Sequence, residues 1–259
     1  MRSAFAVCLA CACGCGLTFV GAAETTGEPD VSGGSEASSS VDGAPTTTDG
    51  AALPDDVAAP DAAPLETSAP QALTHGRATS PANVDLTAEG TLDWIHWGTG
   101  PSPTYANRKA GVSPPIVSDW VVSGSQPQSI SPSSNNPSAF AWSDGAPETS
   151  EGGSNTHVFF KGATNATVQI LVATSPSPRT AQFYLALNRT RARFEVDFDD
   201  GSMPVSSEEH ERNDGARAFV FTVQFRHASP SARLRVRWTM LTIVDPANST
   251  VRVAAVTVK

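Results

Sequence analysis

The chain has 259 residues and a formal net charge of −9, and residues 1–83 hold ten of its 26 acidic residues but only two of its 17 lysines and arginines. Residues 84–259 are therefore close to neutral and provide no basic field for nucleic acid, so we expect no nucleic-acid partner. All four cysteines lie in the first fifteen residues. The folded region must then be held by an ordinary hydrophobic core, without disulfides or cysteine metal sites.

Residues 1–23 have the pattern of a secretory signal peptide. Arg2 precedes an apolar run that ends at Val20, and small residues follow at 21–23. The run is too short and too rich in small residues for a spanning helix. The sequence thus predicts an extracellular or cell-envelope location.

The cysteines within this segment support a second interpretation. Small residues before a cysteine resemble a bacterial lipobox, in which the cysteine becomes a lipidated amino terminus. The lipidation candidates are Cys11, Cys13 and Cys15. A freely secreted protein and an outer-membrane lipoprotein both stay open, and the membrane would be contacted only through the lipid anchor.

Residues 24–83 form a predicted linker. They are rich in Ala, Pro, Ser, Thr, Asp and Glu and contain no Phe, Trp or Tyr. Such a segment buries too little apolar area to offset its ordering entropy. We therefore expect a disordered acidic tether that holds a domain away from an envelope.

From residue 84 onward the hydrophobic pattern changes to a period of two. The clearest alternation runs from Arg191 to Asp199, with apolar residues at even positions and charges at odd ones. This pattern predicts a half-buried antiparallel strand, and a charged loop is expected over 208–212. Further strands are predicted over 84–89, 92–97, 116–122, 139–142, 157–161, 167–173, 181–187, 219–226, 233–240 and 251–258.

No window of ten or more residues sustains helical spacing of apolar positions. Many short strands with one polar face, separated by Gly, Pro, Asn and Asp, are typical of two packed sheets. The sequence predicts an all-β fold over 84–259, an antiparallel two-sheet β-sandwich of jelly-roll type, preceded by the disordered tether.

Two short blocks carry a family resemblance. Asp93–Gly98 reads Asp-Trp-Ile-His-Trp-Gly, and Trp142–Gly145 reads Trp-Ser-Asp-Gly. With the strand-like segment 251–258, they resemble a bacterial extracellular β-sandwich module similar to galactose-binding-like and carbohydrate-binding-like jelly rolls. The resemblance covers nearly all of residues 84–259. It implies a fold and an extracellular location, and assigns no ligand to particular residues.

The same blocks contain the candidate glycan-binding residues. Sugar sites combine a flat aromatic side chain with carboxylates or amides that bind hydroxyl groups. The candidates are Asp93, Trp94, His96, Trp97, Trp142 and Asp144. On a strand, Trp94 and His96 would share one face and Trp97 the other. Because one face must be core, a structural role for these residues stays open.

An aspartate-rich turn is the candidate metal site. Asp197, Asp199 and Asp200 precede Gly201. Carboxylates and backbone carbonyls of such a turn can hold a structural calcium ion. The same sequence is also typical of an ordinary turn that ends a strand, so both interpretations stay open. No other cofactor is expected.

Five arginines form a candidate basic stripe on the polar faces of two predicted strands. They are Arg191, Arg193, Arg233, Arg235 and Arg237. On neighbouring strands they could meet an acidic glycan or a phosphate. The favoured alternative is cross-strand pairing with Glu195 and Asp197.

Catalytic motifs are missing from the sequence. It has no Gly-x-Ser-x-Gly, Gly-rich phosphate loop or His-Glu-x-x-His, and we predict that the protein is not an enzyme. The leading hypothesis is a monomeric, non-catalytic binding module for a glycan. The first alternative is a structural or adhesion protein with an envelope-protein partner. The last is a glycoside hydrolase with two carboxylates from Asp93, Asp119, Asp144, Glu148 and Glu195.

Overall fold

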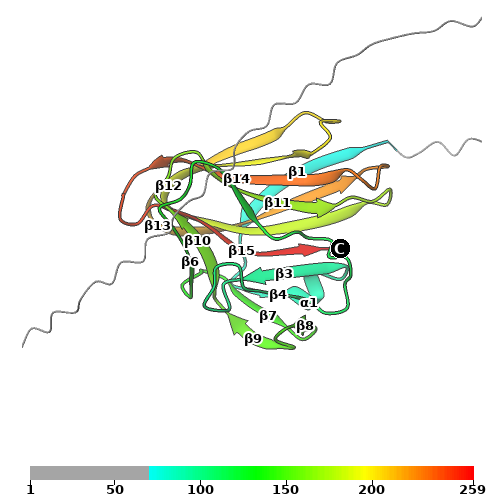
Figure 1. Ribbon diagram of the computed structural model, residues 1–259, viewed down its shortest axis with the longest axis horizontal. Helices are drawn as coiled ribbons and strands as arrows, with labels where there is room; N and C mark the ends of the chain where they lie inside the picture. The colour runs from blue at the N-terminus through cyan, green and yellow to red at the C-terminus, as the bar shows by residue number, and fades with distance from the viewer. Residues whose placement is uncertain (1–69) are drawn as a thin grey trace, which may run out of the picture. The chain divides into compact units, whose positions relative to one another are not determined.

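The computed structural model of the chain describes residues 70–259 (Figure 1). The predicted signal segment with Cys11, Cys13 and Cys15, and most of the predicted linker, lie outside these residues. The described part is almost entirely antiparallel β-structure, and its one helix, α1, is a single turn at Leu86–Glu89. The all-β prediction is confirmed. No helix within 70–259 is long and apolar enough to cross a membrane.

Two long strands organise the domain. β12 (Arg179–Phe198) and β13 (Ser206–Arg226) pair along almost their whole length. Their register shifts between Asn188 and Thr190, where Arg189 has a φ of 46°. On its other edge, β12 pairs first with β15 (Thr250–Val258) and, after this irregularity, with β14 (Arg233–Ile243). One twelve-stranded sheet therefore forms two layers.

The first layer is built around β15, which Figure 1 shows in red beside β3. The N-terminal half of β12 pairs with one edge of β15, and the C-terminal half of β13 pairs with the far edge of β12. The other strands of this layer are β1 (Ala72–Thr79), β3 (Asp93–Trp97), β4 (Ala106–Lys109), β6 (Ser129–Ser133), β8 (Gly145–Ala146) and β10 (His157–Lys161). The second layer continues from β12 through β14, β11 (Ala166–Ala173) and β5 (Val121–Gly124).

The main core lies between these two layers. Phe221 pairs with Phe183 in the first layer, and Phe194 pairs with Trp238 in the second. The rings of Phe194 and Phe221 stack with their centroids 4.1 Å apart and 3° between their planes. All four of these aromatic side chains are buried. Burial of each side chain contributes roughly 1.5–3 kcal/mol to the free energy of unfolding. The alternation in the sequence places these side chains on the inward face and is therefore the origin of this core.

A small sheet makes a second core on the opposite face of the first layer. It consists of β2 (Asn83–Asp85), β7 (Ala139–Trp142) and β9 (Glu151–Ser154). The second core comprises Val84, Leu86, Trp94, Phe140, Trp142, Tyr184, Val220, Ala254 and Ala255. Every residue of β3 and of β15 is buried, and the second core includes Ala254 and Ala255 of β15. The nearly continuous apolar sequence of β15 is typical of a strand that is covered on both faces.

Three segments differ from the sequence-based expectation. β1 lies inside the predicted linker and pairs with β13 from Ala72 to Thr79, so the fold begins before residue 84. Residues 86–89 form α1 because the carboxylate of Asp85 accepts hydrogen bonds from the backbone N–H groups of Thr87 and Ala88. The charged segment 208–212 is part of β13, and its inward-facing polar residues conceal the strand pattern.

Candidate functional site

The tryptophans of the Asp-Trp-Ile-His-Trp-Gly block are core residues. Trp97 belongs to the main core and Trp94 to the second core, and neither has any solvent-exposed surface. The Trp94 ring packs against Trp142, with the centroids 5.5 Å apart. The structural interpretation, which stayed open for these residues, is the one that their burial supports, because the small sheet buries the face of β3 that the main core leaves uncovered.

The two carboxylates of the predicted glycan site connect structural elements. Asp93 is buried and accepts backbone hydrogen bonds from Ile116 at 2.7 Å and Val117 at 3.0 Å. Asp144 accepts hydrogen bonds from Trp94 Nε1 at 2.9 Å and Thr87 Oγ1 at 2.6 Å. It also forms an ion pair with Lys109. Although burial opposes ionisation of Asp144, these three donors hold its pKa below the ordinary value.

His96 is a buried neutral side chain of the second core. Its Nε2 atom donates to the carbonyl oxygen of Thr156 at 3.2 Å, and its ring lies 4.9 Å from Phe140 and 5.4 Å from Trp142. Burial lowers the pKa of His96 to about 4, against a weaker opposing effect of the bond to Thr156. The structural interpretation of His96 is therefore the one that its surroundings support.

Trp142 borders a polar depression of about 340 Å³, which we call the Glu148 depression. The Trp142 side chain is 3% exposed, and its Nε1 atom donates to the carbonyl oxygen of Glu148 at 2.9 Å. Asn107 uses both ends of its amide, because Nδ2 donates to Thr99 and Oδ1 accepts from the Glu148 N–H. Much of the polar lining is thus already paired within the protein.

The three aspartates of the predicted calcium site have separate partners. Asp197 binds the guanidinium of Arg235, with Nε at 3.0 Å. Asp199 accepts the Arg233 N–H, and Asp200 accepts the Ser202 N–H. No group of three His, Cys, Asp or Glu residues within 70–259 is arranged to hold a metal ion. The residues do not form the carboxylate cluster that the calcium prediction requires.

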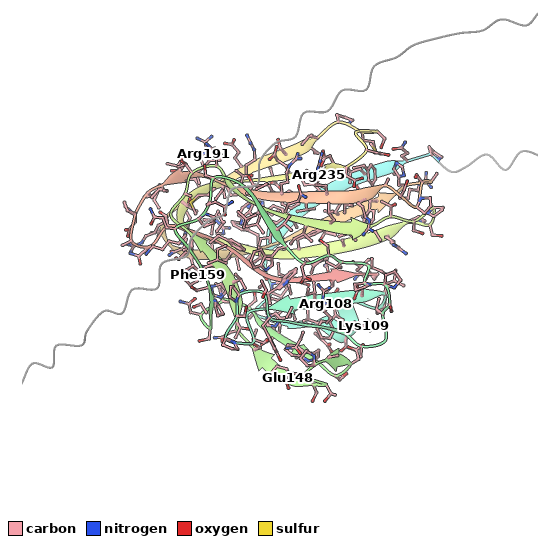
Figure 2. The ribbon with its side chains drawn as sticks, in the orientation of Figure 1. Arg108, Lys109, Glu148, Phe159, Arg191 and Arg235 are labelled. Carbon is pink, nitrogen blue, oxygen red and sulfur yellow. The ribbon has the colours of Figure 1, made fainter. Side chains whose placement is uncertain are left out.

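The predicted arginine stripe is largely neutralised by acidic neighbours. β12 and β14 are adjacent, with Asp197 opposite Arg235 and Glu195 opposite Arg237. Glu195 lies 3.7 Å from the Arg237 Nε atom. Arg191, labelled with Arg235 in Figure 2, pairs with Glu209 of β13. The favoured alternative of cross-strand pairing is confirmed.

A second depression, which we call the Arg252 depression, also lies on the first layer. Its residues are not part of the second core. Its volume is about 170 Å³. Its lining residues are Ser133, Asn135, Phe159, Lys161, Asn188, Ala247, Asn248, Thr250 and Arg252. They come from β6, β10, β12, β15 and two adjoining loops. Figure 2 labels Phe159 beside β6 and β10, whereas Glu148 lies near the small sheet.

Strand register brings the aromatic and basic groups of this depression together. Phe159 of β10 lies opposite Arg252 of β15, and Lys161 lies opposite Thr250. Asn188 of β12 pairs with Thr250 from the other side. Directly opposed residues on antiparallel strands share a face. A half-buried phenyl ring, two cations and an amide are therefore presented on one surface by three adjacent strands.

A fixed turn forms one wall of the Arg252 depression. The carboxylate of Asp245 accepts hydrogen bonds from Asn248 Nδ2 at 2.8 Å, Arg189 Nη1 at 2.6 Å and the Ala247 N–H at 2.9 Å. These bonds, led by those from Asn248 and Arg189, lower the pKa of Asp245 to about 2. The buried Ser249 hydroxyl accepts the N–H groups of Val244 and Asp245. The wall is thus preorganised by the protein itself.

Arg252 is 7% exposed and lacks a carboxylate partner. Its Nε atom donates to Thr250 Oγ1 and its Nη1 atom to Asn135 Oδ1, each at 3.2 Å. No carboxylate of residues 70–259 lies within 4 Å of the guanidinium. Burial lowers the pKa of Arg252. Burial and the Arg252 charge also lower the pKa of the adjacent His157 to about 3. The Arg252 charge is therefore not neutralised by any carboxylate of residues 70–259.

Solved structures that are distantly similar to the chain include TmCBM61 and a bacteriophage tailspike domain. No protein-family model and no curated protein sequence matches the chain. TmCBM61, solved in complex with β-1,4-galactotriose, shares 15% identity over 57% of this chain and 88% of its own, with a TM-score of 0.33. The enzymatically active domain of tailspike protein 4 from bacteriophage CBA120 shares 12% identity over 56% of this chain and 19% of its own, also with a TM-score of 0.33.

Proposed function

We propose that the β domain is a non-catalytic extracellular binding module for a glycan, and that the Arg252 depression is its binding site. The observation that carries the proposal is the combination of groups on three adjacent strands. Phe159 supplies a partly exposed aromatic ring beside the amides of Asn135, Asn188 and Asn248. Aromatic rings pack against the apolar faces of sugars, and amides bind their hydroxyl groups.

The amide oxygens available for this role can be identified from the hydrogen bonds. Asn188 Nδ2 donates to the carbonyl oxygen of Asn248, and Asn248 Nδ2 donates to Asp245. These bonds fix both side chains while each keeps an Oδ1 acceptor with no partner among residues 70–259. Preorganised acceptors reduce the entropy cost of binding. They suit hydroxyl groups, which donate hydrogen bonds.

The lining also supports a non-catalytic role. Glycoside hydrolases place two carboxyl groups on either side of the bond they cleave, and the residues that line the Arg252 depression include no aspartate or glutamate. The depression therefore offers contacts for binding without a general acid or nucleophile.

The test is a glycan array probed with the full-length protein, with and without calcium. We expect binding that is lost in Phe159→Ala and unchanged in Tyr105→Ala, a matched aromatic control whose hydroxyl donates to Glu148. Loss of binding in Tyr105→Ala alone would move the site to the Glu148 depression. No binding to any glycan under either condition would reject the proposal.

We infer from residues 1–23 that the module acts outside the cell, either secreted or lipid-anchored. Lipidation would be tested by membrane partitioning of the expressed protein. If it is anchored, replacement of Cys11, Cys13 and Cys15 by serine should release it to the soluble fraction. Retention in the cytoplasm of the source cell would contradict the extracellular location.

A further inference from the structure

The Arg252 depression contains more positive charge than the protein neutralises. Arg252 and Lys161 both line it, and neither forms an ion pair with any carboxylate of residues 70–259. The Nη2 atom of Arg252 has no hydrogen-bond partner in the same part of the chain, although Nε and Nη1 are occupied. Two N–H donors of a nearly buried guanidinium are therefore available to a ligand.

The surrounding groups explain why this charge persists. Asp245, the carboxylate bound to the lining residue Asn248, is already paired with Arg189. His157 is buried and neutral, so it contributes neither a counter-ion nor a second charge. Removing a charged group from water is costly unless an opposite charge compensates it. An anion in the depression would provide that compensation, and the fixed strands already hold the cations in place.

We propose that the glycan bound by this depression is acidic, and that its carboxylate or sulfate group is held by Arg252 and Lys161. The inference rests on the proposed glycan-binding function and specifies its ligand class. The Arg252 Nη2 N–H groups would donate to the anionic oxygens, as guanidinium groups do to carboxylates and sulfates. Phe159 and the asparagines would contact the uncharged part of the same sugar.

The experiment uses two matched pairs of polysaccharides with the full-length protein. Polygalacturonate is compared with its methyl ester, in which the carboxylates are masked, and dextran sulfate is compared with dextran. Isothermal titration calorimetry at low and high salt measures each affinity. We expect at least one charged polymer to bind tenfold or more tightly than its neutral form. The pair that shows the difference identifies the anion as carboxylate or sulfate.

Charge-removing variants then locate the contact. Arg252→Gln and Lys161→Gln should each weaken binding of the charged polymer by about tenfold to a hundredfold, because each removes a charge-assisted hydrogen bond. Arg233→Gln is the matched control, since Arg233 is an exposed arginine on β14 that forms no ion pair within residues 70–259. It should leave the affinity unchanged. Circular dichroism checks folding, and Lys161→Gln decides the result if Arg252→Gln does not fold.

The outcomes separate this inference from the proposed function. Equal binding of charged and neutral polymers, with loss in Phe159→Ala, would overturn the acidic-glycan inference and leave the glycan-binding function standing. Equal weakening by Arg233→Gln would also overturn it, because attraction would then be spread over the surface. No binding to any of these polymers or to any arrayed glycan would overturn both.

Discussion

The outer face of the first layer has two regions. They differ in whether the small sheet covers them and in whether their charged side chains have partners of opposite charge. Under the small sheet, Trp94 and His96 are buried, and Asp144 is paired with Lys109. Beyond the small sheet, Phe159 is partly exposed and Arg252 lacks a carboxylate partner. Neighbouring strands form both regions. A paired, covered group contributes stability, whereas an unpaired group beside a depression is available to a ligand.

The largest expected effect comes from truncation in the covered region. Trp94→Ala would remove a fully buried indole and the hydrogen bond from Nε1 to Asp144. We expect the free energy of unfolding to fall by about 3–5 kcal/mol, measured by urea denaturation. A loss below about 1 kcal/mol would show that the second core does not support the domain.

Acidification should also destabilise the covered region. An unfolded histidine takes up a proton near pH 6.5, whereas folded His96 stays neutral until about pH 4. The unfolded state therefore binds more protons between these values, so the free energy of unfolding decreases as the pH falls. The difference between the unfolded and folded pKa of His96 corresponds to about 3 kcal/mol in the free energy of unfolding. His157 contributes a loss in the same direction, because its folded pKa is lowered to about 3.

The variant His96→Phe isolates the first of these contributions. It keeps an aromatic ring against Phe140 and Trp142 but cannot take up a proton. Urea denaturation between pH 7 and pH 4 should show roughly half of the histidine-dependent loss seen in the native protein. The same loss in both proteins would contradict the assignment of His96 as a buried neutral group.

Ser249→Ala should weaken the turn that forms one wall of the Arg252 depression. The Ser249 hydroxyl is buried and accepts two backbone N–H groups, those of Val244 and Asp245. Its removal leaves both donors without that partner, and we expect a loss of about 1–3 kcal/mol in the free energy of unfolding. Glycan affinity should fall several-fold, because the turn that positions Asn248 would be held less firmly. Unchanged stability and affinity would show that the turn is not preorganised by Ser249.

The smallest effect on stability is expected for Phe159→Ala. Phe159 is partly exposed, so its truncation should cost about 1 kcal/mol or less in urea denaturation. Glycan binding should nevertheless be lost. The pair Trp94→Ala and Phe159→Ala thus separates stability from binding. A large stability loss in Phe159→Ala would mean that this ring belongs to the core.

The period-two pattern of β12 and β14 correctly predicted their inward-facing core residues and the cross-strand pairing of the arginines with Glu195 and Asp197. It could not reveal the small sheet, because the pattern left open whether the face of β3 that carries Trp94 and His96 is covered or exposed to solvent. The weakly apolar β1 depends on pairing with β13 for its order. Glu208 and His210 face inward on β13, against the usual polarity, so the sequence indicated only the C-terminal part of that strand and predicted a loop over 208–212.

The candidate site was missed because its residues are far apart in the chain and chemically ordinary. Phe159 and Lys161 lie in one short strand, Asn188 in another and Arg252 in a third. One signal was present: Arg252 interrupts an otherwise nearly apolar strand. A charged residue in a strand that is buried on both faces needs a partner, and the sequence could not show whether another part of the chain supplies one.

The most direct test of the central claim is an amide NMR titration of the protein with a short acidic oligosaccharide, oligogalacturonate or its sulfated counterpart, chosen by the calorimetry. We expect chemical-shift changes at Phe159, Lys161, Asn248 and Arg252, with no changes around Trp94 and Glu148. Changes centred on Glu148 and Trp142, with none at Arg252, would contradict it.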